Sequence, residues 1–175
     1  LSSFSMLREA GFDNINLDLI FGLPWQNLAS WENSLKRAVA LQPEHFSLYS
    51  LIIEPGTRLH DWHQKGLINP QDQDLEGDMY QFAVDFLASQ GYEHYEISNW
   101  VKRNPNVDHR CRHNMQYWLN APYFGFGTGS HGFVNQIRTE NEPDLELYIE
   151  KIEQNPLNER DFPRTPVTIN AQKVD

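Results

Sequence analysis

The pattern of apolar and polar residues predicts two strands joined by a helix in the first third of the chain. In residues 14–21, isoleucine and leucine alternate with polar residues, which is the period of a strand with two different faces. Residues 45–53 are dense in apolar side chains and predict a second strand, buried on both faces. Between them, Asn27 is the expected N-cap of a helix that runs to about Leu41. This unit predicts a right-handed crossover in a parallel α/β sheet.

The remaining periodicity predicts further helices and strands. Helical spacing of apolar residues occurs in residues 3–10, 58–65, 72–89 and 144–154, and one helical turn is expected at residues 113–118. Strands are expected at residues 92–97 and 133–138, and a loop is expected at residues 98–110. The proline-marked segment after Pro156 is interpreted as a linker.

Asp18 is the first candidate binding residue, because it lies in the second half of the first predicted strand. Parallel α/β sheets carry their sites at the carboxyl ends of the strands. If the two flanking leucines face the covering helices, Asn16 and Asp18 face the interior of a barrel or a cleft. A carboxylate there is unfavourable unless it meets an amine, a hydroxyl or a cation of a ligand. The alternative is an exposed aspartate on an edge strand.

Residues 111–118 (CRHNMQYW) concentrate an imidazole, two large aromatic rings and a guanidinium in one short span. This combination suits a large planar anionic ligand. Aromatic faces pack on its ring, a histidine can reach a metal, and an arginine pairs with a carboxylate. The alternative is a packed loop whose polar groups bond to nearby backbone. The glycine-rich run at residues 125–132 (GFGTGSHG) lacks the full spacing of a dinucleotide-binding loop, so its signal is weak.

Two groups of histidines are poor candidates for metal sites. His60 and His63 lie three positions apart on a predicted helix, and without a third ligand they are expected on a solvated helix face. Cys111 lies between His109 and His113, and this triplet lacks the fourth ligand of a zinc site. A lone cysteine also cannot hold an iron–sulfur cluster, which needs about four thiolates or an open-site set of three.

Composition limits the classes of binding partner and the cellular compartment that are expected. The formal net charge is −10 and no block of lysine and arginine offsets it, which disfavours a nucleic-acid partner. No apolar run approaches the ~18 residues that a membrane span needs. One cysteine excludes an internal disulfide framework and favours a reducing compartment, so a cytoplasmic location is expected.

Several stretches of this sequence resemble one family. Residues 16–24 (NLDLIFGLP) are similar to the fifth-strand motif of the radical S-adenosylmethionine enzymes related to oxygen-independent coproporphyrinogen III oxidase. Residues 47–57 (SLYSLIIEPGT) resemble the sixth strand and its exit loop. Residues 95–100 (YEISNW), 111–118 and 125–132 are similar to the haem-chaperone branch of that family, HemW. The His-Asn-x-x-Tyr-Trp signature separates this branch from the oxidases and is the most specific of these motifs.

The resemblance implies a fold and a set of domains. The fold class is expected to be α/β, and the sequence to be a fragment of a longer chain. Residues 1–91 would form the C-terminal part of a partial (β/α)6 TIM-like barrel, and residues 92–155 a small α+β extension. Residues 156–175 would be a linker toward a further domain.

The resemblance also implies site residues. Asp18 matches the strand aspartate that contacts S-adenosylmethionine. His113, Asn114, Tyr117 and Trp118 match the motif associated with haem binding. His113 is the candidate ligand of the haem iron, and a polar contact to the porphyrin edge is its other role. The ligands of a [4Fe-4S] cluster are expected outside this sequence.

The function implied by the resemblance is that of a haem chaperone, which delivers haem to haem-requiring proteins such as respiratory enzymes. The whole protein would also hold a [4Fe-4S] cluster and S-adenosylmethionine, and a homodimer is compatible with this expectation. The alternative is an enzyme of porphyrin biosynthesis that decarboxylates coproporphyrinogen III by an adenosyl radical. One departure is Trp25, where relatives often have glycine after Gly-Leu-Pro, and a positive φ there would strain tryptophan.

Overall fold

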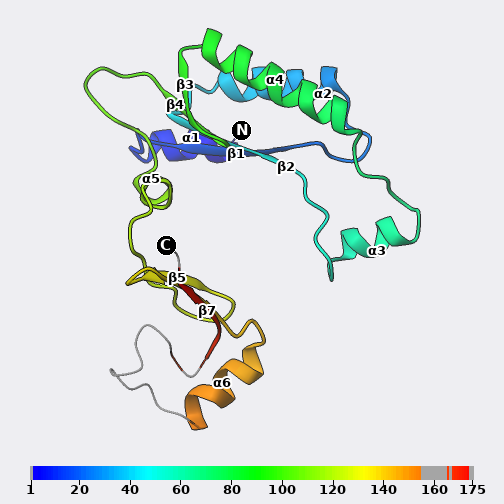
Figure 1. Cartoon of the computed structure of the whole chain (residues 1–175). Helices are drawn as coiled ribbons and strands as arrows, with labels where there is room; N and C mark the ends of the chain where they lie inside the picture. Colours follow the sequence, from blue (N-terminus) through cyan, green and yellow to red (C-terminus); the bar gives the residue numbers. More distant parts are fainter. Residues whose placement is uncertain (1, 155–164, 166, 174–175) are drawn as a thin grey trace. The chain divides into compact units, whose positions relative to one another are not determined.

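The structure is a computed structural model that describes residues 2–154, 165 and 167–173. Its chain divides between Arg110 and Cys111 into two units (Figure 1). The first unit contains α1 (Ser2–Glu9), β1 (Asn16–Phe21), α2 (Leu28–Val39), β2 (His45–Ser50), α3 (Arg58–Gln64), α4 (Gln73–Ser89), β3 (Tyr92–Glu96) and β4 (Asn99–Lys102). The second unit contains α5 (Arg112–Trp118), β5 (His131–Val134), β6 (Ile137–Asn141), α6 (Leu145–Gln154) and β7 (Thr168–Lys173). No helix in the described part of the chain is long and apolar enough to cross a membrane.

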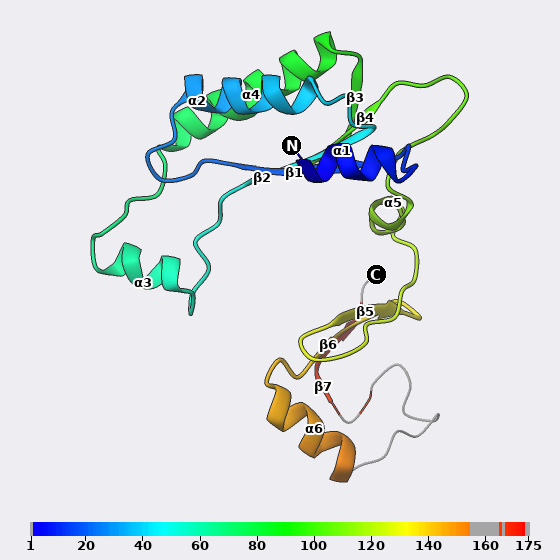
Figure 2. The same ribbon diagram turned by 180° about the vertical axis from the view of Figure 1, so that it is seen from behind.

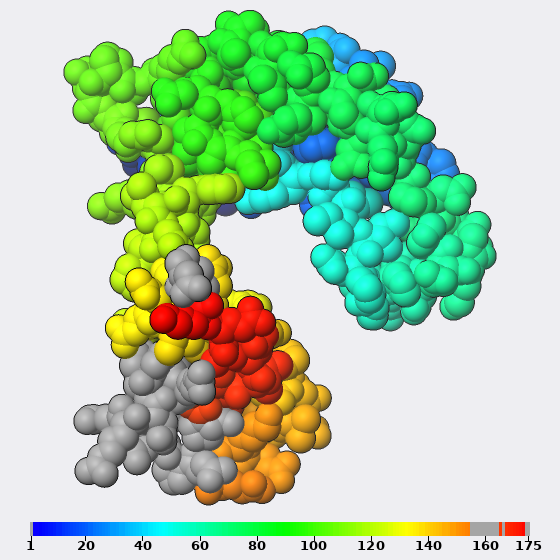
Figure 3. All heavy atoms as spheres, viewed as in Figure 1, coloured from blue at the N-terminus to red at the C-terminus, as the bar shows by residue number. Residues whose placement is uncertain are grey.

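A four-stranded sheet with the order β1-β2-β4-β3 is the centre of the first unit. β1 and β2 are parallel, which confirms the prediction from the strand–helix–strand pattern, and β4 is antiparallel to both β2 and β3. α2 and α4 cover one face of this sheet, as both ribbon views show (Figures 1 and 2). Their atoms lie side by side in the space-filling view, where α4 is green and α2 is blue (Figure 3).

Helix α2 begins at the residue that the sequence predicts. The side chain of Asn27 accepts a hydrogen bond from the backbone N–H of Ser30 at 2.8 Å. The Ser30 hydroxyl in turn accepts one from the backbone N–H of Asn27 at 3.2 Å. This reciprocal pair satisfies two of the backbone donors that a helix start leaves without partners.

The core of the first unit lies between the sheet and the two covering helices. Leu17 and Leu19 pack against it from β1, as the alternation predicts. Trp31 of α2 is almost fully buried and donates its indole N–H to the carbonyl oxygen of Met79 at 2.9 Å, which joins α2 to α4. Trp100 of β4 is fully buried as well. Because buried aromatic rings dominate core energetics, the two tryptophans fix both helices and β4 on the sheet.

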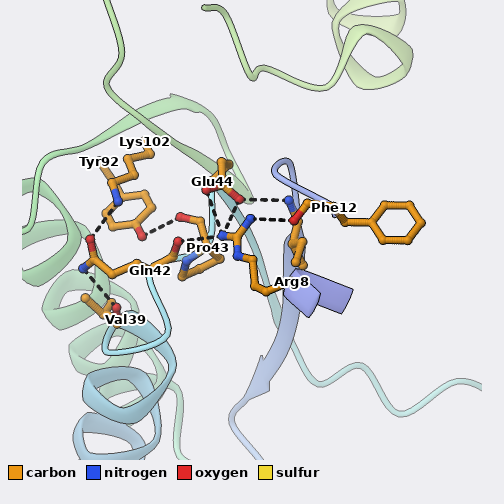
Figure 4. Close-up of polar contacts among 9 residues, drawn as sticks. Arg8, Phe12, Val39, Gln42, Pro43, Glu44, Tyr92 and Lys102 are labelled. Atoms are coloured by element: carbon orange, nitrogen blue, oxygen red, sulfur yellow. Dashed lines mark hydrogen bonds and ion pairs between the residues drawn. The ribbon is translucent and has the colours of Figure 1, made fainter. Parts of the chain in front are cut away.

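Polar contacts at the amino ends of β1 and β2 connect α1 to the sheet (Figure 4). The guanidinium of Arg8 pairs with Glu44 at 2.8 Å and also donates to the carbonyl oxygen of Gln42 at 3.0 Å. The hydroxyl of Tyr92 donates to the carbonyl oxygen of Pro43 at 2.7 Å. Burial, together with the nearby carboxylate of Glu44, raises the pKa of Tyr92 to about 12. Residues 42–44, which connect α2 to β2, are therefore held by Arg8 of α1 and by Tyr92 of β3.

The second unit contains an antiparallel sheet with the order β5-β6-β7. The β5–β6 hairpin turns at Asn135 and Gln136, whose φ angles are 53° and 61°. Two successive positive φ values are the geometry of a type I′ turn, whose twist matches that of the flanking strands. The unit is therefore α+β, with α5 before the hairpin and α6 after it.

Three predicted segments differ in the structure. The loop predicted at residues 98–110 contains β4, which the sequence analysis missed. The single strand predicted at residues 133–138 is wrong, because the turn at 135–136 divides it between β5 and β6. The predicted linker at residues 156–175 lies largely outside the described residues, but residues 168–173 form β7 on β6. Strands this short have too little local pattern, and their hydrogen bonds come from partners elsewhere in the chain.

The boundary between the units also differs from the predicted one. The predicted boundary follows Gly91, whereas the structure divides after Arg110. The reason is that β3 and β4, which follow Gly91, are hydrogen bonded into the sheet of the first unit through β2. The strand predicted at residues 45–53 is shorter than expected and ends at Ser50.

Candidate functional site

One face of β1 and β2 carries polar side chains, as the alternation predicts. Asn16 and Asp18 are exposed on it, and the parallel register places His45 and Ser47 of β2 beside them. β1 is an edge strand of the described sheet. Within the described residues the sheet is open on this side, so Asp18 lies on an exposed face rather than in an enclosed interior.

Asp18 is held by its neighbours through one carboxylate oxygen. The side-chain amide of Asn16 donates to Oδ1 of Asp18 at 2.5 Å. The Oδ1 atom of Asn16 lies 2.7 Å from Nδ1 of His45. Among the described residues, Oδ2 of Asp18 accepts no hydrogen bond, so it can accept from a hydroxyl or an amine of a ligand.

The environment of His45 favours the neutral imidazole over the charged one. Burial lowers the pKa of His45, and this effect outweighs the carboxylates of Asp18 and Glu96, which act in the opposite direction. Its Nε2 atom lies 2.7 Å from the hydroxyl oxygen of Tyr95. His45 was not among the predicted site residues, although polar residues at alternating positions of an otherwise apolar strand are a signal that indicates such a site.

Asn99 adds a buried acceptor that the sequence analysis also missed. It is 3% exposed and lies opposite Ser47 in the β2–β4 register. Its side-chain amide donates to Glu96, but its Oδ1 atom has no partner within the described part of the chain. An unpaired buried oxygen costs about 1–3 kcal/mol, so a donor from water or from a ligand would stabilise it.

The predicted haem motif lies on α5 in the second unit. His113 and Tyr117, four positions apart, share one side of this helix: their rings are 5.0 Å apart, edge to face, and Nε2 of His113 is 3.2 Å from the tyrosine hydroxyl. The other ring nitrogen, Nδ1, is 3.3 Å from the side-chain nitrogen of Gln116. The imidazole is exposed, and Asn114 is half-buried. The histidine is therefore oriented by its neighbours and still accessible.

Large apolar side chains on α5 and in the segment that follows it are exposed, and we call them the aromatic surface. They are Tyr117, Trp118, Leu119, Phe124 and Phe126. Trp118 is 54% exposed and Phe126 is 85% exposed, so these rings do not fill a core. Exposed aromatic groups of this kind provide flat contact area for a ligand or a partner.

The glycine-rich run packs the start of the hairpin closely. A Cβ atom on Gly125 would lie 2.3 Å from the carbonyl oxygen of His131, which no side chain tolerates. The buried side chain of Asn141 donates to the carbonyl oxygen of Gly127 at 3.2 Å and to Ser130 at 3.0 Å. The glycines thus serve close backbone packing, and they hold the segment that carries Phe124 and Phe126.

The described residues contain no group of three or more histidine, cysteine, aspartate or glutamate side chains that could hold a metal ion. His63 of α3 has its Nδ1 atom 3.3 Å from the carbonyl oxygen of Ile68. Cys111 is half-buried and provides no side-chain cap to α5. Arg110, which precedes it, is paired with Asp108 at 2.8 Å, and this guanidinium lowers the pKa of Asp108 to about 2.

Trp25 follows β1 and has a φ of 63°. The turn after Gly-Leu-Pro therefore does require a positive φ, as the resemblance suggested for a position that is often glycine. The indole is 82% exposed, so packing within the described chain does not explain the conformation.

No protein-family model matches the chain. It is 42% identical over 151 residues to "Heme chaperone HemW" of Bacillus subtilis, which covers 86% of this chain and 39% of the relative. It is 36% identical over 147 residues to the protein of the same name from Lactococcus lactis, covering 84% and 38%. It is 31% identical over 155 residues to "Radical S-adenosyl methionine domain-containing protein 1, mitochondrial" of Danio rerio, covering 83% and 34%. The chain thus spans about two fifths of the length of these curated relatives, or less.

Among solved structures, the chain is similar to coproporphyrinogen III oxidase from Escherichia coli, described as a radical SAM enzyme. The TM-score is 0.69 and the sequence identity 17%, with 99% of this chain and 40% of that chain covered. At this identity the likeness shows the fold alone. It confirms the predicted α/β fold.

Proposed function

This chain belongs to the HemW family, the haem-chaperone relatives of the radical S-adenosylmethionine enzymes, and from that membership and its own side chains we propose that the protein binds haem and delivers it to haem-requiring proteins. The observation that carries the proposal is the exposed, oriented His113 on a helix flanked by the aromatic surface. The family membership supports haem as the ligand, and the side chains support α5 as its location.

Each residue of the motif has a physical role in the proposed site. The imidazole of His113 provides either a ligand to the haem iron or a polar contact to the porphyrin edge. The rings of Tyr117 and Trp118 provide apolar faces for the macrocycle. Asn114 provides an amide within the same helical turn, and the exposed guanidinium of Arg112 suits a propionate.

We further propose that the whole protein also holds S-adenosylmethionine and a [4Fe-4S] cluster, and that β1 and β2 belong to a partial (β/α)6 barrel in a cytoplasmic protein. The open polar face fits this role, because Oδ2 of Asp18 and Oδ1 of Asn99 are acceptors without partners in the described chain. When bound, the cofactor and the cluster supply radical chemistry. Cys111 is the sole cysteine of this chain, so the cluster's thiolates must come from elsewhere in the whole protein.

Haem titration of the protein, followed by Soret absorbance, tests the proposed site. Loss of an iron ligand in His113→Ala would shift the Soret band and the spin state, because axial ligation sets both. Loss of an edge contact would lower the affinity and leave the spectrum unchanged. Trp118→Ala should weaken binding roughly two- to tenfold through lost stacking, in addition to the effect of lost area.

Matched controls come from α3, which carries the same residue types in the first unit. His60→Ala and Trp62→Ala should titrate with haem as the parent does, since neither belongs to the α5 motif. Arg112→Ala should have a small effect, because an exposed charge is screened by solvent. Parent-like haem affinity in both His113→Ala and Trp118→Ala would exclude a haem site on α5.

The role of Asp18 is tested in the whole protein carrying its cluster. Asp18→Asn should weaken S-adenosylmethionine binding by about 1–3 kcal/mol, the range for losing one partner of a charge-assisted hydrogen bond. The melting temperature should change little, because asparagine fits the same space. Unchanged affinity together with a lower melting temperature would make Asp18 a structural residue.

The alternative function, oxidative decarboxylation of coproporphyrinogen III, has no separate observation in its favour. The similarity to the Escherichia coli oxidase shows the fold alone. The relatives with 36–42% identity carry the chaperone name.

A further inference from the structure

A continuous chain of hydrogen bonds crosses the polar face of the first unit. It runs from the hydroxyl of Tyr95 to Nε2 of His45 at 2.7 Å, and from Nδ1 of His45 to Oδ1 of Asn16 at 2.7 Å. It continues from Nδ2 of Asn16 to Oδ1 of Asp18 at 2.5 Å. Its members come from β3, β2 and β1, and its directly bonded side chains are up to 50 residues apart in the sequence.

The donor and the acceptor of each of these hydrogen bonds follow from the chemical groups involved. The carboxylate of Asp18 can only accept, so the amide of Asn16 must donate to it. A reversed amide would place a carbonyl oxygen against a carboxylate oxygen at 2.5 Å, which is repulsive. The Oδ1 atom of Asn16 then faces His45 and accepts from Nδ1–H. In a neutral imidazole with the proton on Nδ1, Nε2 is an acceptor, and the Tyr95 hydroxyl donates to it.

We infer that His45 is a positioning residue for Asp18, acting through the Asn16 amide in the Nδ1–H tautomer that Tyr95 fixes. This inference rests on the proposed function of Asp18 as a contact of S-adenosylmethionine. By holding Oδ1 of Asp18, these hydrogen bonds direct the free Oδ2 atom of the carboxylate to the ligand. Ser47 supports the same orientation, because its hydroxyl oxygen lies 3.2 Å from the Asn16 amide nitrogen.

The surroundings of His45 favour this role. Its side chain is on a strand and 5% exposed, so its rotamer is fixed by packing. The β1–β2 register pairs Asn16 with His45 and Asp18 with Ser47. The hydrogen-bond relay from Tyr95 to Asp18 therefore lies on one face of the sheet, and strands rather than loops carry its side chains. Burial also lowers the pKa of His45, which keeps the imidazole neutral at physiological pH.

Two isosteric variants separate positioning from simple packing. His45→Asn places an amide near Nδ1 and keeps a donor for Asn16, whereas His45→Gln places its amide near Nε2 and removes that donor. In the cluster-loaded whole protein, His45→Gln should weaken S-adenosylmethionine binding roughly two- to tenfold, the range for one neutral hydrogen bond, and His45→Asn should retain affinity near the parent's. Equal affinities in the two variants would overturn the inference.

A double-mutant cycle tests whether the effect passes through Asp18. If it does, adding His45→Gln to Asp18→Asn should cause no further loss, because the group being positioned has already been changed. Additive losses would show that His45 acts independently of Asp18 and would overturn the inference. Unchanged affinity in Asp18→Asn alone would instead overturn the proposed role of Asp18.

Nitrogen NMR of the protein labelled with 15N-histidine determines the tautomer of His45, and this test needs no ligand. His45 should show a protonated Nδ1 and an unprotonated Nε2, and its signals are identified by their loss in His45→Asn. Tyr95→Phe removes the donor to Nε2 and should raise the population of the Nε2–H tautomer. An Nε2–H tautomer in the parent, or no change in Tyr95→Phe, would overturn the inference even if Asp18 binds the cofactor.

Discussion

At the residue scale, Trp25 combines an exposed indole with a backbone conformation that tryptophan rarely adopts. A positive φ brings Cβ close to the following carbonyl oxygen and costs about 1–2 kcal/mol outside glycine. Its side chain is 82% exposed, so few contacts within the described chain offset this cost. Glycine at this position would therefore remove the strain at the loss of few contacts.

Trp25→Gly should raise the free energy of unfolding by about 1 kcal/mol, because glycine relieves the strain and few contacts are lost. Chemical denaturation of parent and variant measures this change. Trp62→Gly is the control, since Trp62 is exposed but lies in helix α3, where glycine is unfavourable. A loss of stability in Trp25→Gly would show that the indole makes stabilising contacts.

His45 makes the stability of the first unit depend on pH. Its pKa in the folded state lies below the ordinary value of 6.5, mainly because burial disfavours the charged imidazole. As pH falls, the unfolded state binds a proton first, so the free energy of unfolding decreases from about pH 7 downward until the folded pKa is passed. Above pH 7 this contribution is fully present.

Denaturation at about pH 7.5 and pH 5 checks this prediction. The parent should lose more stability between the two values than His45→Asn does, because asparagine does not titrate. The comparison between the proteins removes the contribution of the other histidines. Equal losses would show that His45 does not link protonation to folding.

At the element scale, two glycines have opposite functions. Gly125 lies where the chain approaches the hairpin so closely that a Cβ atom would meet the carbonyl oxygen of His131 at 2.3 Å. Gly77 lies in helix α4 with nothing within 4 Å of the position of a Cβ atom. The first is needed for close packing, and the second only lowers the stability of its helix.

Alanine at the two positions should therefore have opposite effects. Gly125→Ala should destabilise the second unit by about 2 kcal/mol or more, because backbone must move to relieve the overlap. Gly77→Ala should stabilise α4 by about 1 kcal/mol through its helix propensity. Hydrogen exchange of amides in β5 and β6, compared with those in β1 and β2, localises each effect. Normal protection of the hairpin in Gly125→Ala would contradict the first expectation.

At the scale of the whole molecule, the proposed cofactors depend on residues beyond this chain. Iron–sulfur clusters need about three or four thiolates, and the chain has one cysteine. We therefore expect that reconstitution of the 175-residue chain with iron and sulfide gives no stoichiometric cluster absorbance. Haem should still bind, because the proposed haem residues all lie on α5. A stable [4Fe-4S] spectrum from this chain would refute the prediction.

The sequence by itself determined the features that depend on neighbouring residues. Alternation along residues 14–21 separated the two faces of β1, so that Leu17 and Leu19 lie on the core side and Asp18 on the polar side. Asn27 was identified as a helix cap because a cap needs only the next three residues. The motif on residues 113–118 was visible for the same reason, since positions three and four apart on a helix share one side.

Only the tertiary structure decided the features that join distant segments. β4 and β7 are strands because β2, β3 and β6 supply their hydrogen bonds, and a short run of residues carries no such information. The relay through His45 depends on Tyr95, which lies 50 residues away in the sequence. Its geometry arises from the register between β1 and β2, which pairs Asn16 with His45, 29 positions away in the sequence.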